Sequence, residues 1–451
     1  MLFAQSIRKG TAMGLSTSAA IAPGGRRAAQ RPRVPNPALA NLPQIDSLDA
    51  AFERMEFLPA DATAETAVMP TVQHAHLGFD LVRAVYQSAS ERDLSLLEFR
   101  NKTESALEVM FHQSDRHGHS TPAAKVRVPN AVARGFLVVV PEGMGRLAIR
   151  RALVRLFGEE VDEIDVDSPE GLVCYLRARI LVVQFGPTGG LRAFAKGFVK
   201  AFDDALGLNL FSKARGRIHR GEDEIGALLQ ALAIAGSLGC LIVENINTRN
   251  ARPDKASELW DTLARFADET GIPVVIMVTP GAAAALAEQD SARRALSGAG
   301  QYYIPPHAVD SLHWLAEAQF IFNRYLRKHF GTEAPDWYFD VLWKETLGHR
   351  DLGHKLCAHM SRNWRDLVTT DVSRDHFSRA AELALLLEQP HLKAVTTARK
   401  YRGSLTNTSV RRHGDWLPLD LVMQTVPGLE DEKGRRISYL GDVDRGGTSG
   451  A

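Results

Sequence analysis

The chain has 451 residues, of which 45% are apolar and 24% are charged. These proportions are typical of a globular protein, and the length is sufficient for two or three domains with substantial cores. The formal net charge is only +1, so a nucleic-acid surface would have to come from a local cluster of basic residues. A protein that binds nucleic acid through a large overall positive charge is excluded.

Three cysteines, Cys174, Cys240 and Cys357, lie far apart and show no CxxC spacing. This arrangement argues against a disulfide framework or a zinc cluster and favours a reducing compartment. No apolar run approaches the ~18 residues that a membrane-spanning helix needs. We therefore expect a cytoplasmic protein without a membrane partner.

Residues 1–45 contain no acidic residue and carry several arginines among Ala, Ser, Gly and Pro. An organelle transit peptide and an arm that binds DNA are both basic and disordered, and an ordinary solvated start is the third interpretation. We predict a basic disordered arm whose role stays open.

Residues 46–130 contain three segments with apolar residues on one helical face, separated by prolines. They predict a small helical N-terminal region. His74 and His76, and a second histidine group within residues 112–119, have no cysteine and few carboxylates beside them, which disfavours a metal site. We interpret them as solvated loop histidines.

Residues 135–158 read as a strand, a glycine-bearing turn and an amphipathic helix. Such a unit can bind phosphate, because the turn exposes backbone N–H groups and the helix N-terminus carries partial positive charge. Compared with the consensus GxxxxGK[ST], Gly145 matches the second glycine, but Val140, Arg146 and Leu147 replace the first glycine, the lysine and the hydroxyl residue. Arg146 retains a positive charge, whereas Leu147 cannot bind Mg²⁺. From these residues alone, an ordinary turn without nucleotide remains an alternative.

Strands and helices then alternate along the chain. We predict a strand within residues 175–185, helices at 191–206, 222–237 and 255–270, and strands at 240–243 and 273–278. This order predicts an α/β fold with a parallel sheet covered by helices. Ligands bind such sheets at the carboxyl ends of the strands, here followed by residues 141–146, 186–190, 244–247 and 279–281.

Glu244 and Asn245 end the strand LGCLIVENIN. A nucleotide hydrolase has an acidic residue at this point to hold Mg²⁺, and often a glutamate beside it to orient the attacking water. Glu244 could hold a metal, but Asn245 is neutral and cannot accept a proton. The alternative is a strand-end turn stabilised by polar side chains.

Six segments, in order, resemble the TnsC and TniB group of AAA+ proteins, which are ATP-dependent regulators of bacterial transposition. The resemblance covers residues 97–402. The segments are GFLVVVPEGMGR, ILVVQFGPTGGLRAFAKGFVKAFDDALG, ALAIAGSLGCLIVENIN, TGIPVVIMVTPGA, LWKETLGHRDLGHKLCAHM and DVSRDHFSRAAELALLLEQPHLKAV.

The resemblance implies an AAA+ (P-loop) α/β core at residues 131–300, a helical lid at 301–402, the helical region at 46–130 and a flexible C-terminal tail at 403–451. In this family such tails contact the transposase, and a plain disordered end is the alternative. The tail contains one short apolar stretch, WLPLDLVMQTV, that could anchor it.

The resemblance also implies roles for individual residues. The phosphate loop of the family corresponds to Gly143, Met144, Gly145 and Arg146, and the residue whose hydroxyl binds Mg²⁺ corresponds to Leu147. The Walker B aspartate corresponds to Glu244, and the catalytic glutamate corresponds to Asn245. The sensor-1 residue corresponds to Thr279. Arg293 and Arg294 fall near the inter-subunit arginine, and Arg350 falls in the sensor-2 region.

The implied function is a regulator that assembles rings or filaments of its own copies on DNA with ATP and Mg²⁺, and that bridges a target-selection protein to a transposase. Because the hydrolytic residues are substituted, we expect weak or absent hydrolysis and a catalytically degenerate scaffold. Two alternatives stay open. One is a divergent ATPase switch with Arg146 on the phosphates and Glu244 on the metal, and the other is an α/β interaction module without DNA.

A basic stretch that includes Lys213, Arg215 and Arg217 could contact the DNA backbone. It lacks a motif that reads a groove, so its contacts would be independent of sequence. A solvated loop is the alternative interpretation.

Overall fold

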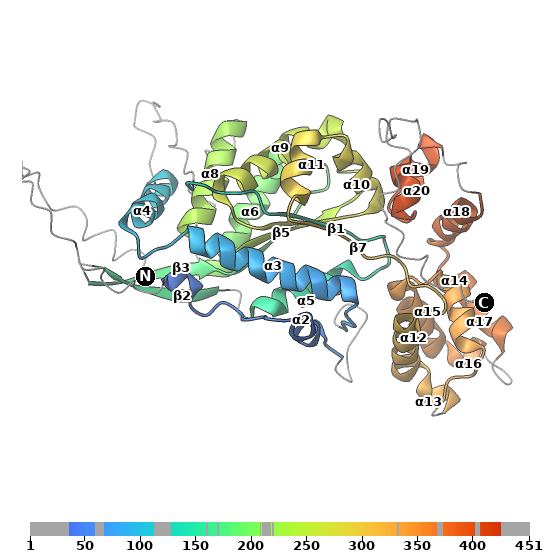
Figure 1. Ribbon diagram of the computed structural model, residues 1–451. Helices are drawn as coiled ribbons and strands as arrows, with labels where there is room; N and C mark the ends of the chain where they lie inside the picture. The colour runs from blue at the N-terminus through green and yellow to red at the C-terminus, as the bar shows by residue number, and fades with distance from the viewer. Residues whose placement is uncertain are drawn as a thin grey trace, which may run out of the picture. The chain divides into compact units, whose positions relative to one another are not determined.

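A five-stranded parallel sheet lies at the centre of the computed structural model (Figure 1). Its strand order is β4-β5-β6-β1-β7, and every neighbouring pair is parallel. The strands are β1 (Gly135–Val139), β4 (Ile180–Gln184), β5 (Cys240–Ile246), β6 (Val274–Val278) and β7 (Gly300–Tyr303). The prediction of an α/β fold with a parallel sheet covered by helices is therefore confirmed.

The structure describes residues 36–58, 67–111, 128–158, 161–168, 171–207, 209, 218, 221–331, 333–367, 373–401 and 406–424. Most of the predicted basic arm at residues 1–45 lies outside these residues. Lys213, Arg215 and Arg217 also lie outside them.

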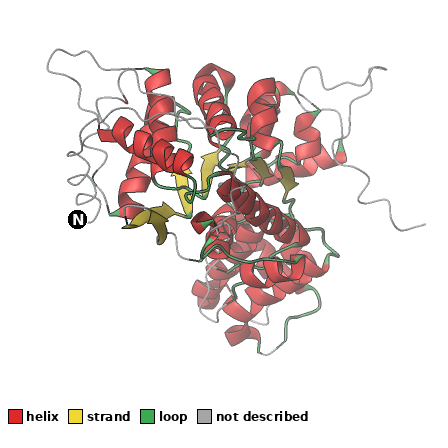
Figure 2. Ribbon diagram, turned by 60° about the vertical axis from the view of Figure 1, so that its left-hand side comes forward, coloured by secondary structure: helices red, strands yellow, loops and turns green. Residues whose placement is uncertain are grey.

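Helices cover both faces of the sheet (Figures 1 and 2). Alternate strand residues point to opposite faces, so Leu137 packs into one apolar core and Val138 into the other. The first core includes helices α4 (Leu97–Phe111), α6 (Leu191–Leu206), α8 (Glu222–Ala235), α9 (Pro253–Thr270), α10 (Pro280–Ala287) and α11 (Asp290–Ser297). The second core includes α2 (Leu48–Met55), α3 (Val72–Glu91) and α5 (Arg146–Phe157).

A two-stranded antiparallel ribbon, β2 (Val161–Ser168) and β3 (Gly171–Ala178), stands apart from the central sheet. The strand predicted within residues 175–185 is β4, and the end of β3, which belongs to the other sheet, lies in the same stretch of sequence. The two strands separate at Arg179, whose guanidinium donates to Phe157 O at 2.9 Å and to Asp162 Oδ2 at 2.9 Å. Arg177 of β3 also binds Asp162, and it reaches the short helix η1 (Pro37–Leu39) by donating to Ala38 O at 2.7 Å.

The interpretation of His74 as a solvated loop histidine is wrong. His74 lies in the first turn of α3, and its Nδ1 accepts from the Thr71 backbone N–H at 2.9 Å. The ring is buried, and burial lowers the pKa of His74 to about 3, so a neutral imidazole caps the helix.

A third core belongs to the lid, which consists of helices. They are α12 (Leu312–Tyr325), α13 (Arg327–Phe330), α14 (Tyr338–Thr346), α15 (Arg350–Arg362), α16 (Trp364–Leu367), α17 (Arg374–Ala384) and α18 (Gln389–Lys400). Trp314, Phe322, Tyr338 and Phe377 are fully buried there and pack edge to face in part.

Part of the expected C-terminal tail packs against this lid core. Helices α19 (Asn407–His413) and α20 (Leu419–Met423) flank a short connection. Leu417, Leu421 and Val422 are buried among lid residues, so the apolar stretch noted in the sequence is an anchor. Among the described residues, no helix has the length and apolarity to cross a membrane.

Gly135 tests the packing of α11 on the sheet. A Cβ added to Gly135 would lie 2.2 Å from Ala295 O, whereas one added to Gly226 in α8 would meet nothing within 4 Å. We expect Gly135→Ala to lower the free energy of unfolding by about 1–3 kcal/mol, because backbone must move. The matched Gly226→Ala should raise it by up to ~1 kcal/mol through helix propensity. Urea unfolding measures both, and a Gly135→Ala variant as stable as the wild type would contradict this packing.

Candidate functional site

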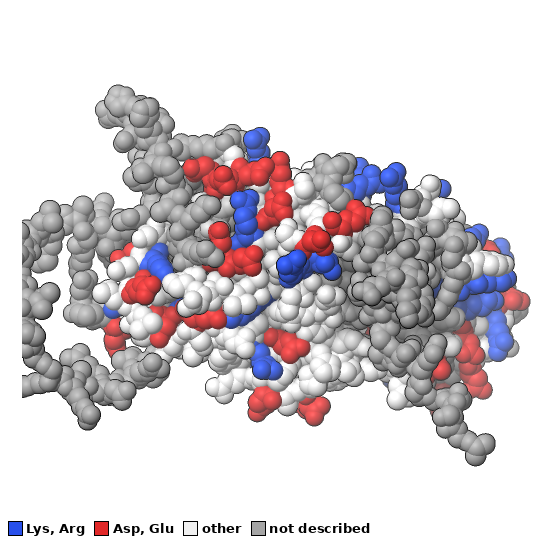
Figure 3. All heavy atoms as spheres, turned by 45° about the horizontal axis from the view of Figure 1, so that its top comes forward, with Lys and Arg blue, Asp and Glu red and all other residues white. Residues whose placement is uncertain are grey.

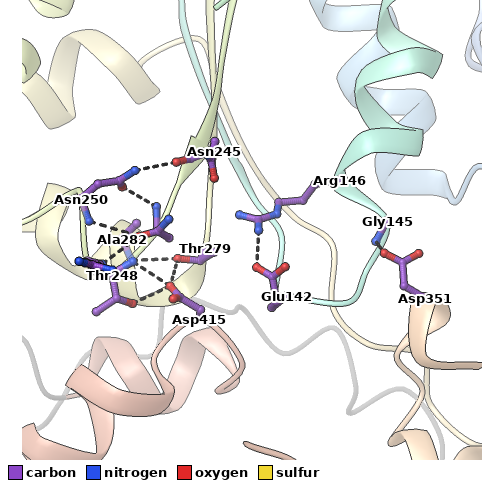
Figure 4. Close-up of polar contacts among 12 residues, drawn as sticks. Glu142, Gly145, Arg146, Asn245, Thr248, Asn250, Thr279, Ala282, Asp351 and Asp415 are labelled. Carbon is purple, nitrogen blue, oxygen red and sulfur yellow. Dashed lines mark hydrogen bonds and ion pairs between the residues drawn. The ribbon is translucent and has the colours of Figure 1, made fainter. Parts of the chain in front are cut away.

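The turn after β1 carries two glycines in left-handed conformations and leads directly into helix α5. Gly143 and Gly145 have φ angles of +80° and +75°, which residues other than glycine rarely adopt. Helix α5 begins at Arg146, and the Gly145 N–H donates to Asp351 Oδ2 at 3.1 Å (Figure 4). The N–H at the helix start thus already faces an anionic oxygen, as it would face a phosphate.

The side chains of the turn differ from the phosphate-loop consensus. Arg146 forms an ion pair with Glu142 of the same turn, and its buried Nη1 has no hydrogen-bond partner among the described residues. Met144 is buried in the apolar core beneath α5. Leu147 offers no oxygen where a Mg²⁺-binding hydroxyl would stand. The charge of Arg146 is therefore balanced within the turn.

Glu244 is paired with a cation. The Arg150 Nη1 donates to Glu244 Oε1 at 2.6 Å, and Gln184 of the neighbouring strand also donates to this carboxylate. A bulge in β5 accompanies this arrangement, since the register with β6 shifts between Val243 and Ile246. Arg150 lies one turn beyond Arg146 on α5, so it connects the helix after the glycine turn to the acidic residue of β5.

Asn245 lies at the centre of the bulge. Its φ of +62° is in the left-handed region, where asparagine is among the more tolerated residues. The side chain is exposed, and its backbone O accepts from Asn250 Nδ2 at 2.8 Å. An amide at this place cannot accept a proton from water.

These residues do not fit Mg²⁺-dependent hydrolysis. Mg²⁺ needs oxygen ligands in near-octahedral geometry, usually one or two carboxylates with substrate phosphates. Glu244 already neutralises Arg150, Leu147 supplies no ligand, and Asn245 cannot act as a base. The Gly145 N–H and Arg146 are donors of the kind that bind a phosphate group, but in this structure Asp351 and Glu142 already accept from them.

Thr279 joins a second group of contacts at the strand ends. Its Oγ1 caps α10 by accepting from the Ala282 N–H at 3.4 Å, and its hydroxyl donates to Asp415. Thr248, after β5, donates to the same Asp415 Oδ1 from its N–H at 2.8 Å and from its hydroxyl at 2.6 Å. Figure 4 shows this cluster beside Arg146 and Glu142.

The backbone of the same segment contacts two further loops. The Glu142 N–H donates to Asp415 O at 2.8 Å, and the Gly281 N–H donates to Gly414 O at 2.9 Å. Hence the connection between α19 and α20 binds the loops that follow β1, β5 and β6. Sequence reasoning predicted these loops as ligand sites but missed Asp415 as the residue that joins them. The only signal for it was the adjacent apolar stretch.

Arg350, which the resemblance places in the sensor-2 region, lies beside the glycine turn. Its Nε donates to Glu317 Oε1 at 3.0 Å, and its Nη2 donates to Ala67 O at 2.7 Å. Its Nη1 lies 2.7 Å from the position that a Cβ on Gly145 would take. Burial opposes ionisation of Glu317, but Arg350 and His354 outweigh it and lower the pKa of Glu317 to about 2. Burial raises the pKa of the neighbouring Asp351 to about 6.

The remaining predicted residues divide into two groups. Arg146 and Glu244 lie at the same edge of the sheet, although β6 separates their strands β1 and β5. Arg293 and Arg294 lie on α11, whose Leu296 packs against Gly135 at the opposite end of β1. The structure therefore does not bring these two arginines to the glycine turn of the same chain.

No protein-family model matches the sequence, and no curated protein matches it. The solved structures that are similar to this chain at a distance include the following three. A Walker-type ATPase of Pyrococcus abyssi shares 13% identity over 65% of this chain and 80% of its own, with a TM-score of 0.36. The Orc1 protein of Aeropyrum pernix, solved in complex with DNA, shares 13% identity over 70% of this chain and 75% of its own, with a TM-score of 0.36.

The Cdc6p protein of Pyrobaculum aerophilum shares 11% identity over 73% of this chain and 96% of its own, with a TM-score of 0.33. These likenesses are too distant to carry an argument about activity. The site is therefore interpreted from its own geometry.

A double-mutant cycle tests the pairing of Glu244. Arg150→Met keeps most of the side-chain volume, and Glu244→Gln keeps the shape of the carboxylate. Because both groups are largely buried, we expect a coupling free energy of about 1–3 kcal/mol in urea unfolding of the two single variants and the double variant. Additive effects would show that the two side chains do not interact.

Proposed function

We propose that this chain is a catalytically degenerate AAA+-type scaffold of the TnsC and TniB kind. In this role it would link target DNA, or a target-selecting protein, to a transposase. The observation that carries the proposal is the 2.6 Å ion pair between Arg150 and Glu244, which holds the Walker B-like carboxylate on a cation of the protein.

The contrast between framework and chemistry supports this proposal. The parallel sheet, the glycine turn with two left-handed glycines, and the following helix are all present. The positions that would hold the metal and the attacking water carry Leu147, a paired Glu244 and Asn245. Each lost catalytic element would cost roughly 3 kcal/mol or more of transition-state stabilisation. The simplest account is that the chain keeps the fold but does not hydrolyse ATP.

The proposed assembly is a ring or filament of identical chains. In such an assembly an arginine of one subunit would approach the glycine turn of the next. Arg294 is exposed on α11, and the Arg293 side chain is 43% exposed although it pairs with Asp290 at 2.8 Å. Both are therefore accessible to a neighbouring copy, which supports the inter-subunit role that the resemblance implies.

The proposed DNA contact is electrostatic and independent of sequence. Arg192, Lys196 and Lys200 recur every fourth residue on the exposed side of α6, which precedes in the sequence the basic stretch that contains Lys213 and Arg215. Elsewhere the charges are mixed, and Figure 3 shows Lys and Arg side chains beside Asp and Glu side chains on the described part of one face. A local stripe is thus a better candidate for DNA than the surface as a whole.

Phosphate release from Mg·ATP tests the absence of turnover. We expect the full chain, with or without duplex DNA, to release phosphate no faster than its Arg146→Ala variant, because neither Leu147 nor Asn245 can serve the reaction. A rate of about 1 s⁻¹ or more, typical of an enzyme that uses these groups and abolished by Arg146→Ala, would contradict the proposal. That result would support the divergent ATPase switch instead.

The salt dependence of DNA binding tests the basic stretch. Changing Lys213, Arg215 and Arg217 to Ala should reduce the slope of log K against log salt by about 2–3, because each lost phosphate contact contributes ~0.9. The matched control changes three exposed basic residues of the lid, Arg327, Lys328 and Lys393, to Ala. An equal effect of both triple variants would indicate a net-charge effect, and no salt-dependent binding by the wild type would favour an interaction module without DNA.

A further inference from the structure

The connection between α19 and α20 occupies the position where a ligand of the parallel sheet would bind. Asp415 Oδ1 accepts three hydrogen bonds, from the Thr248 N–H at 2.8 Å, from the Thr248 hydroxyl at 2.6 Å and from the Thr279 hydroxyl. A backbone N–H and two hydroxyls that converge on one oxygen form a site for an anion. The anion that fills it is part of the chain itself.

The neighbouring Trp416 covers the glycine turn. Its Cζ3 lies 3.4 Å from the position that a Cβ on Gly143 would take. Its ring stacks on His391 with a centroid distance of 5.2 Å and an interplanar angle of 19°, and it lies 5.6 Å from the ring of His349. A phosphate chain that approached the N–H groups of this turn would meet the indole.

Contacts on both sides hold the segment in this place. Leu417, Leu421 and Val422 are buried in the lid core, and the Gly281 N–H donates to Gly414 O at 2.9 Å. The segment is therefore anchored in the lid at one end and hydrogen-bonded to the strand ends at the other. Its fit involves the side chain of Asp415, the backbone and apolar burial together.

We propose that the strand-end site is a carboxylate-binding site whose ligand is the chain's own Asp415, and that the Gly414–Asp415–Trp416 segment excludes nucleotide from the glycine turn. The site takes an acidic peptide segment in place of a phosphate group, since both present oxygens to the same donors. This inference does not depend on a role in transposition.

Hydrogen exchange in the full-length protein tests the carboxylate site. Asp415→Ala should accelerate amide exchange by about tenfold or more in peptides that cover residues 406–418 and in the peptide that contains Thr248, because the segment loses three hydrogen bonds to one charged group. The control Asp420→Ala removes the same charge from the adjacent helix α20, and these peptides should keep their wild-type exchange. Unchanged exchange in Asp415→Ala would overturn the proposed site.

Calorimetric titration with ATP tests the exclusion. The Asp415→Ala, Trp416→Ala double variant should bind ATP at least about tenfold more tightly than the wild type, and Asp420→Ala should bind as the wild type does. No difference between the double variant and the wild type, whether both bind or neither does, would overturn the exclusion. Hydrolysis of ATP by the double variant would overturn the degenerate scaffold while it supports the exclusion, so the two proposals can fail separately.

Discussion

Parallel pairing of β5, β6 and β1 sends three loops out of the sheet at one edge, and the chemistry of this protein follows from that constraint. The loops bring backbone N–H groups and the hydroxyls of Thr248 and Thr279 together, so the edge attracts negative charge. In this chain the Thr248 N–H and both hydroxyls donate to Asp415 Oδ1.

The other charges at this edge are also balanced within the molecule. Glu142 pairs with Arg146, and Arg150 pairs with Glu244. The Arg150–Glu244 pair is the more buried of the two, and removing one of its partners would leave the other charge without a counter-charge. A metal ion at Glu244 would therefore have to compete with Arg150 for the same carboxylate.

Helices and buried strands with a regular apolar pattern could be predicted from the sequence. The apolar period of α6 gave its bounds at residues 191–206, and the continuous apolar run of β6 gave a buried strand. The ribbon of β2 and β3 and the four-residue β7 were missed, because alternating polar strands and very short strands give weak signals. Arg146 and Glu244 follow or end strands whose carboxyl ends lie at one edge of the sheet, but β6 lies between these strands, so they are not neighbours in the sheet.

The partners of those residues could not be found in the same way. Arg150 is 94 residues from Glu244, and Thr248 is 167 residues from Asp415. The spacing of residues in a single sequence does not predict such pairs, because they form only when helices and strands that are distant in the sequence pack against one another. The departures from the phosphate-loop consensus could be identified in the sequence. The ion pair of Arg150 with Glu244 and the hydrogen bonds of Thr248 to Asp415 could not.

Arg350 contacts three separate parts of the chain. One buried guanidinium is shared by the lid through Glu317, by the N-terminal region through Ala67 O and by the turn through its close approach to Gly145. Because Arg350 and Glu317 both belong to the lid, moving the lid away from the sheet would leave this ion pair intact. It would instead break the hydrogen bond from Arg350 to Ala67 O and the one from the Gly145 N–H to Asp351. Two consecutive residues at the start of α15, Arg350 and Asp351, therefore link the lid to the N-terminal region and to the glycine turn.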